Sequence, residues 1–141
     1  MKKIQIINGP NLNLLGTREP QIYGHRSFSD YLLELRAALP EVALRYEQTN
    51  HEGRIIDLLQ DFGFGQAEGI VLNAAGYTHT SVSIRDAIAA IEAPVVEVHI
   101  SDIRTREPFR QTSLLTDVCA HTIIGQGLDG YRQAIDWLIS K

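Results

Sequence analysis

The sequence predicts an α/β fold built on a parallel β-sheet. Short runs of β-branched residues alternate along the chain with segments whose apolar residues recur at helical spacing, which favours strand-helix-strand units over a bundle or a sandwich. Three of these runs are almost entirely apolar, as expected for central strands covered on both faces. The 141 residues suit a single domain, residues 1–141, of a size that buries about two thirds of its unfolded surface without disulfides or metals.

Five strands are predicted, each bounded by turn residues or by a helix signal. They span residues 3–8, 42–49, 69–73, 94–100 and 122–125. Right-handed crossovers, and pairing between strands that are neighbours in the chain, then favour a flavodoxin-like, doubly wound sheet with the strand order 2-1-3-4-5.

Four helices are predicted from their end signals. The first begins at Ser27, with Asp30 as its capping partner, and runs to about residue 40. The second begins with a capping box of Thr49 and Glu52 and ends near residue 63. The third spans residues 81–91. The last begins near residue 128 and presents one apolar face, formed by Tyr131, Ile135 and Leu138.

The composition excludes several classes of partner. The chain is 44% hydrophobic and 21% charged with a net charge of −4, so it has no electrostatic footprint for nucleic acid, and anions have to be bound by local groups. A single cysteine, Cys119, allows no internal disulfide and fits a reducing compartment. No apolar stretch approaches the length of a signal sequence or a membrane span. We therefore expect a cytoplasmic protein with no membrane or nucleic-acid partner.

Polar side chains gather where three of the predicted strands end. Open parallel sheets bind ligands beyond the carboxyl ends of their strands, so these side chains are expected to meet at one edge. The set comprises Asn8 and Asn11 after the first strand, Asn73 and His79 after the third, and His99, Ser101, Arg104, Arg106 and Arg110 at the end of the fourth and beyond it. This convergence predicts a ligand site.

Structural roles compete with this interpretation. His79 could cap the third helix, His99 could be a buried histidine satisfied by Glu97, and the arginines could form a solvated loop face. Two histidines at neighbouring strand ends favour a site, with one or two of the arginines touching the ligand. The remaining histidines are interpreted as surface or structural residues: His25, His51 and His121.

Metal and dinucleotide binding receive little support. His79, His99, Glu97 and Asp86 are of metal-ligating types, but no two histidines have i, i+4 spacing on a helix, so no metal is expected. Residues 125–130 match G-x-G-x-x-G, yet the chain ends before the second strand and the acidic residue that the dinucleotide fingerprint requires. These glycines predict a tight turn, which could help to hold an anion at a helix N-terminus.

The remaining groups suit proton abstraction next to a carbonyl in a carboxylate substrate, without a cofactor. Arg18 and Tyr23 flank a proline that can turn the chain back, so that a guanidinium could meet a phenol and favour its ionised form. The lysines lie at the termini, at positions 2, 3 and 141, so no Schiff-base mechanism is expected. The enolate would be stabilised by hydrogen-bond donors, with Asn11 a candidate, directly or through water.

Four motifs make the chain resemble the type II 3-dehydroquinate dehydratases of the shikimate pathway. They are NGPNL at 8–12 with LLGTREP and IYG up to residue 24, LNAAGYTHTS at 72–81, VEVHIS at 96–101 and REPFR at 106–110. The resemblance covers essentially the whole chain. It implies trans-elimination of water from 3-dehydroquinate to give 3-dehydroshikimate in chorismate and aromatic amino acid biosynthesis, with no cofactor, and a homododecamer arranged as a tetramer of trimers.

The resemblance also implies roles for individual residues. Tyr23 would be the base, Arg18 would lower its pKa, and His99 would protonate the departing hydroxyl. Residues 17–26 resemble the closing lid of the family, and Asp86 would reach the site of a neighbouring subunit. Substrate hydroxyls and carboxylate would be held by Asn73, His79, Ile100, Ser101 and Arg110.

Two departures from the family pattern, and the size of the pKa shift that Tyr23 needs, qualify these roles. Ala75 stands where many relatives have glycine, and Asp102 follows the serine where asparagine is frequent, so substrate affinity is affected more than reaction type. Ionising a phenol of pKa about 10 near pH 7 needs about 3 units, whereas one cation supplies about 1 to 3. We therefore hypothesise that a second cation such as Arg106 assists Tyr23.

Two other classes of function stay open on the sequence. A flavin or nucleotide carrier of flavodoxin type would use the glycine turn at 125–130, and a non-catalytic protein of the same fold would bind the substrate without changing it.

Overall fold

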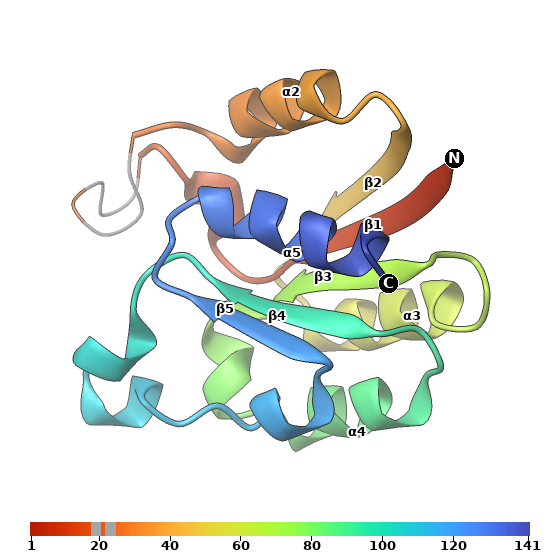
Figure 1. The fold of residues 1–141 in the computed structure, drawn as a ribbon. Coiled ribbons are helices and arrows are strands. Elements are labelled where there is room, and N and C mark those ends of the chain that lie inside the picture. Colours follow the sequence, from red (N-terminus) through yellow and green to blue (C-terminus); the bar gives the residue numbers. More distant parts are fainter. Residues whose placement is uncertain (18–20, 22–24) are drawn as a thin grey trace.

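The computed structural model describes residues 1–17, 21 and 25–141, and within them five parallel strands form one sheet in the order β2-β1-β3-β4-β5 (Figure 1). The strands are β1 (Lys2–Asn8), β2 (Val42–Gln48), β3 (Gly69–Asn73), β4 (Val95–His99) and β5 (His121–Ile124). All neighbouring strands are parallel. The predicted order is confirmed, and each predicted strand boundary lies within one residue of the observed one.

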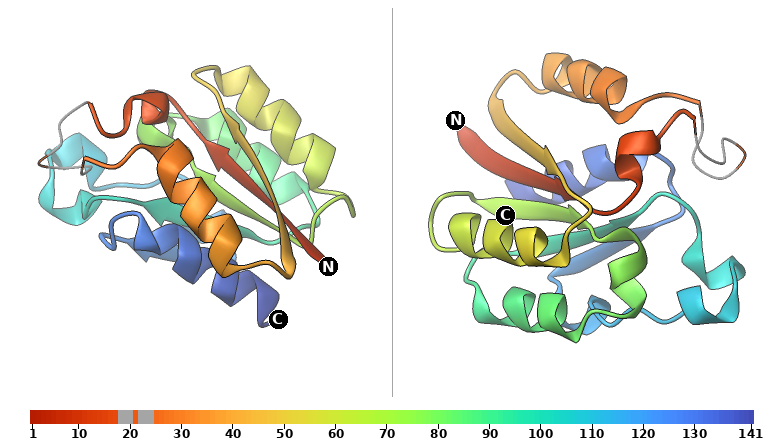
Figure 2. Two further views of the ribbon diagram at one scale, coloured as in Figure 1. Left: turned by 90° about the horizontal axis from the view of Figure 1, so that it is seen from above. Right: turned by 180° about the vertical axis from the view of Figure 1, so that it is seen from behind.

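Helices cover both faces of the sheet, as a doubly wound fold requires (Figure 2). Helices α2 (Phe28–Ala38) and α5 (Asp129–Ile139) pack on one face, and α3 (Glu52–Phe62) and α4 (Val82–Ala90) on the other. Successive side chains of a strand point to opposite faces. Ile6 of β1 therefore joins the core beneath α2 and α5, whereas Ile7 joins the core beneath α3 and α4. Within the described residues, no helix is long and apolar enough to cross a membrane.

Serine caps begin two of the helices. The Ser27 hydroxyl accepts a hydrogen bond from the Asp30 amide at 3.1 Å, which confirms the predicted start of α2. The Ser81 hydroxyl likewise accepts from the Ile84 amide at 2.9 Å. Ser81, not His79, is therefore the cap of α4, and the alternative structural role weighed for His79 is wrong.

The predicted capping box of Thr49 and Glu52 is also wrong. The Thr49 hydroxyl accepts from the His51 amide at 3.1 Å and so closes a turn before the helix, which begins only at Glu52. Asn50 in this turn is bound by two other loops. Its side-chain oxygen accepts from the Asn11 amide, and its carbonyl accepts from the Tyr77 hydroxyl. The loop after β2 is thereby tied to the loops after β1 and β3.

Tyr131 of α5 joins the ends of the neighbouring strands β1 and β3. Its phenol is fully buried; it donates to Oδ1 of Asn8 at 2.7 Å and accepts from Nδ2 of Asn73 at 3.0 Å. Asn8 and Asn73 are register partners in β1 and β3, so a single hydroxyl reaches both. Burial raises the pKa of Tyr131, which keeps the phenol neutral and able to donate.

Replacing Tyr131 with phenylalanine should lower the free energy of unfolding by about 1–3 kcal/mol, because two buried amides lose a partner while the ring is retained. Urea unfolding measures the change. Tyr46→Phe is the matched control, since the Tyr46 hydroxyl is only partly buried and lies 3.4 Å from Nδ2 of Asn8; its loss should stay below about 1 kcal/mol. Equal losses in the two variants would contradict a special role for the Tyr131 hydroxyl.

Candidate active site

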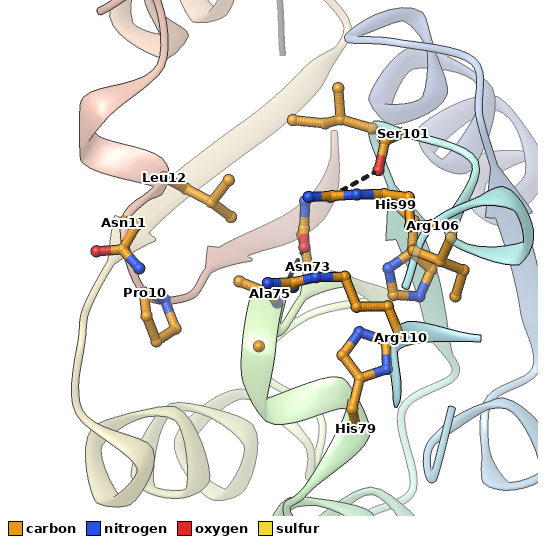
Figure 3. Close-up of a pocket in the computed structure, with 13 residues that line it drawn as sticks. Pro10, Asn11, Leu12, Asn73, Ala75, His79, His99, Ser101, Arg106 and Arg110 are labelled. Carbon is orange, nitrogen blue, oxygen red and sulfur yellow. Dashed lines mark hydrogen bonds between the residues drawn. The ribbon is translucent and has the colours of Figure 1, made fainter. Parts of the chain in front are cut away.

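A cavity opens at the carboxyl ends of β1, β3 and β4, where the sequence places its polar side chains (Figure 3). Seven of the predicted site residues line it, together with Arg106, which was expected as a second cation. The seven are Asn11, Asn73, His79, His99, Ile100, Ser101 and Arg110. Side chains that follow three strands therefore meet at one cavity, as the sequence predicted.

Three residues with an implied catalytic or binding role are not among those that line the cavity, and neither are Asn8 and Arg104 of the predicted strand-end set. Arg18 and Tyr23, with most of the predicted lid at 17–26, lie outside the described residues. Asp86 lies exposed on α4 and does not line the cavity of its own subunit.

His99 is held by the carboxylate of Glu97. The two residues are two positions apart on β4 and so share a face, with Nε2 of His99 2.5 Å from Oε2 of Glu97. Glu97 is 1% exposed. Burial raises the pKa of Glu97, but hydrogen bonds from His99, Ser113 and Thr116 outweigh this effect and hold the pKa below its usual range. The buried His99–Glu97 pair weighed from the sequence is confirmed.

His79 presents the other imidazole of the cavity. Its Nδ1 donates to the carbonyl of Thr112 at 2.8 Å, because a carbonyl oxygen can only accept. Burial lowers the pKa of His79, and the nearby His99 and Arg110 lower it further against the opposing effect of the Thr112 bond. Near pH 7 the ring is therefore neutral with Nε2 unprotonated, which makes Nε2 a hydrogen-bond acceptor.

Two arginines give the cavity its positive charge. Arg106 donates from Nη1 to the Ser101 hydroxyl at 3.2 Å, and its side chain is 15% exposed (Figure 3). Arg110, 25% exposed, donates from Nε to Glu107 at 3.1 Å and extends its guanidinium over the cavity. Two largely buried arginine side chains beside a neutral imidazole suit an anionic ligand that also carries hydroxyl groups.

The third arginine of this loop pairs outside the cavity. Arg104 is 68% exposed and binds both carboxylate oxygens of Asp102, at 2.9 and 3.0 Å. This pairing lowers the pKa of Asp102. Asp102 is absent from the cavity lining, so its negative charge is neutralised outside the cavity.

Strained backbone shapes the wall opposite the arginines. Ala75 has φ 53° and Asn11 has φ 69°, in the left-handed region that disfavours a side chain such as alanine. The Asn73 side-chain oxygen accepts from the Ala75 amide at 3.1 Å, which holds that turn in place. Figure 3 shows Asn11 across the cavity from His99 and Arg106.

The glycine motif at 125–130 fixes the end of β4. Gly125 and Gly127 have φ +76° and +61°, and their amides donate to the carbonyls of His99 and Ile100, each at 3.0 Å. The predicted tight turn is confirmed, and it positions two cavity residues. Among the described residues, no group of three histidine, cysteine or acidic side chains could hold a metal ion.

The chain matches known proteins over nearly its whole length. The family model described as dehydroquinase class II matches residues 2–139. A 3-dehydroquinate dehydratase of an Exiguobacterium species is 53% identical over 139 residues, covering 97% of this chain and 94% of that protein. One from Rhodopseudomonas palustris is 48% identical, covering 99% and 94%. The crystal structure of type II dehydroquinase from Butyrivibrio crossotus superposes with a TM-score of 0.94 at 44% identity, covering 98% and 97%.

Ala75→Gly should leave the free energy of unfolding within about 0.5 kcal/mol of the wild type. Relief of about 1–2 kcal/mol of left-handed strain offsets the added backbone entropy of glycine and the loss of a partly buried methyl. Ala74→Gly is the control, because Ala74 has φ −77° and is 1% exposed. It should lose about 1–2 kcal/mol in the same urea titration. A comparable loss at both positions would show that Ala75 is unstrained.

Proposed function

The chain belongs to the class II dehydroquinase family, and from this premise we propose how its cavity removes water from 3-dehydroquinate. The protein is a hydro-lyase of the shikimate pathway. The family match across residues 2–139 carries this assignment, and the cavity supports it with two arginines for a carboxylate and two imidazoles held in different ways.

In the proposed reaction Tyr23, as its phenolate, removes a proton from the carbon beside the substrate carbonyl. The electron pair forms an enolate, which Asn11 stabilises by donating a hydrogen bond directly or through water. The enolate then expels the hydroxyl, which leaves as water with a proton from His99. This elimination is redox-neutral, so it needs no electron carrier. Arg18, assisted by Arg106, favours the phenolate by its positive charge.

Substrate recognition uses the remaining groups. Arg110, with Ser101 and the backbone of Ile100, binds the carboxylate and hydroxyl groups at the end of β4. The neutral His79 accepts a hydrogen bond from a substrate hydroxyl at Nε2, a role that its lowered pKa and its bond to Thr112 support. The Asn73 side chain lines the opposite wall and is braced by Tyr131.

The protein is further proposed to act in the cytoplasm as a homododecamer, a tetramer of trimers, with Asp86 reaching a neighbouring site. The exposed position of Asp86 on α4, away from its own cavity, supports a role between subunits. Sedimentation at the mass of twelve chains is expected. A monomer in sedimentation equilibrium that turns over substrate at the full rate would contradict this assembly.

Adding 3-dehydroquinate to the purified protein should produce a growing ultraviolet absorbance from the enone of 3-dehydroshikimate, with no nucleotide or metal supplied. A protein that binds the substrate but leaves it unchanged would show no such absorbance. Nucleotide-dependent thermal stabilisation without turnover would instead indicate a nucleotide carrier.

Tyr23→Phe serves as the control variant in this assay. It should abolish turnover while the protein still folds and still binds a substrate-like carboxylate, because only the phenol oxygen is removed. Turnover within about tenfold of the wild type would exclude Tyr23 as the base, since losing the base that a reaction requires costs roughly 10²–10⁴-fold.

A further inference from the structure

The Glu97 carboxylate accepts four hydrogen bonds in a buried position. His99 and the Ser113 hydroxyl donate to Oε2 at 2.5 and 2.6 Å, and the Thr116 and Thr122 hydroxyls donate to Oε1 at 2.7 and 3.0 Å. The three hydroxyls come from the loop after η4 (Pro108–Arg110), from η5 (Thr116–Val118) and from β5. Glu97 and Thr122 are register partners of neighbouring strands, so the backbone itself sets this contact.

Four donors use the whole accepting capacity of a carboxylate. Its two oxygens offer about four lone-pair positions, and a protonated carboxyl would have to donate where it now accepts. The Ser113 hydroxyl is fixed further, because it also accepts from the Leu115 amide at 3.1 Å. A proton on Glu97 would therefore displace one of the four donors.

The ionised state of Glu97 determines which nitrogen of His99 carries the hydrogen. Since Glu97 only accepts, Nε2 of His99 carries a hydrogen and donates it, and Nδ1 is left as the nitrogen that can exchange a proton at the cavity. A carboxylate with fewer hydrogen-bond donors could instead accept the proton from Nε2, and His99 could then change to the tautomer that is protonated on Nδ1.

We propose that Ser113, Thr116 and Thr122 are positioning residues that keep Glu97 a carboxylate throughout turnover, so that His99 presents Nδ1 to the leaving hydroxyl. This proposal rests on the proposed dehydration and on the role of His99 as its acid. None of the three hydroxyls lines the cavity, so they act through Glu97 and not on the substrate.

The surroundings of Glu97 leave its charge dependent on these donors. Among the described residues, the titratable groups that act on it or respond to it are His99, His79 on η2 (Ala75–His79) and Cys119 after η5. Arg110 acts in turn on His79, and Asp117 on Cys119. Burial, with Glu97 and Asp117 nearby, raises the pKa of the Cys119 thiol to about 12, so it stays neutral near pH 7. Hydrogen bonds, together with the electrostatic attraction of His99, therefore stabilise the carboxylate against the effect of burial.

Thr122→Val tests the proposal, because valine keeps the shape and the β-branching of threonine and removes only the hydroxyl. In Thr122→Val the acidic limb of the kcat–pH profile should lie about one pH unit higher than in the wild type, which is the size expected for one lost hydrogen bond to a charged group. The Thr116→Val, Thr122→Val double variant, which strips Oε1 of its donors, should move the limb further. KM should stay within about twofold, because substrate contacts are unchanged.

Thr122→Ser is the matched control, since it keeps the hydroxyl and loses the methyl; it should retain the wild-type profile. A wild-type profile in Thr122→Val, or an equal shift in Thr122→Ser, would overturn the proposal. In either case the wild type still converts 3-dehydroquinate, so the result is distinct from failure of the proposed function, which would leave the wild type itself inactive.

A second measurement does not depend on activity. The folded-state pKa of Glu97 is depressed, so its contribution to stability is present above the unfolded-state value near 4.3 and is lost as pH falls through the folded-state value. At pH 7 the Tm of Thr122→Val should therefore lie a few degrees below that of Thr122→Ser, and this gap should narrow in acid. A gap that is independent of pH would show a packing role only and would sink the proposal.

Discussion

The cost of burying polar groups organises the carboxyl edge of this sheet. A buried amide, phenol or carboxylate without a partner loses about 1–3 kcal/mol or more, so the buried amides, phenol and carboxylate at this edge are held in hydrogen bonds. The Tyr131 hydroxyl hydrogen-bonds to both Asn8 and Asn73. Three hydroxyls and His99 donate hydrogen bonds to Glu97. The same bonds that satisfy these groups fix the walls of the cavity, so stability and site geometry have a common origin here.

The sequence predicted the location of the site because parallel topology is simple to apply. Once strand order and direction were assigned, residues as distant as Asn11, Asn73 and Arg110 had to meet at one edge, and they line one cavity. The partners beneath the cavity could not be predicted in the same way. Glu97 in an apolar strand signals that a buried charge needs donors, but its three hydroxyl donors lie 16 to 25 positions further along the chain. Nothing in their local pattern distinguishes them from ordinary loop or strand residues.

The incorrect capping box shows that tertiary contacts can override a local helix-start signal. Thr49 and Glu52 have the spacing of a helix start, yet Asn50 between them is engaged by the loops after β1 and β3. These tertiary bonds keep the turn extended until Glu52, so local propensity gives way to contacts that no short window of sequence contains. The displaced start also frees the Glu52 carboxylate to accept from the Ser81 hydroxyl at 2.5 Å, which links α3 to the cap of α4.

The two histidines of the cavity show how partners, more than residue type, assign chemical roles. His79 donates from Nδ1 to a neutral carbonyl, and its lowered pKa makes it an uncharged ring that accepts through Nε2. His99 donates from Nε2 to a carboxylate that accepts three further hydrogen bonds, so Nδ1 is the nitrogen that is not bound to Glu97. One ring is thus suited to holding a hydroxyl and the other to giving a proton to one. Because the two rings are held by partners from different segments, Thr112 in one case and Glu97 in the other, a change at either partner can alter one role without touching the other.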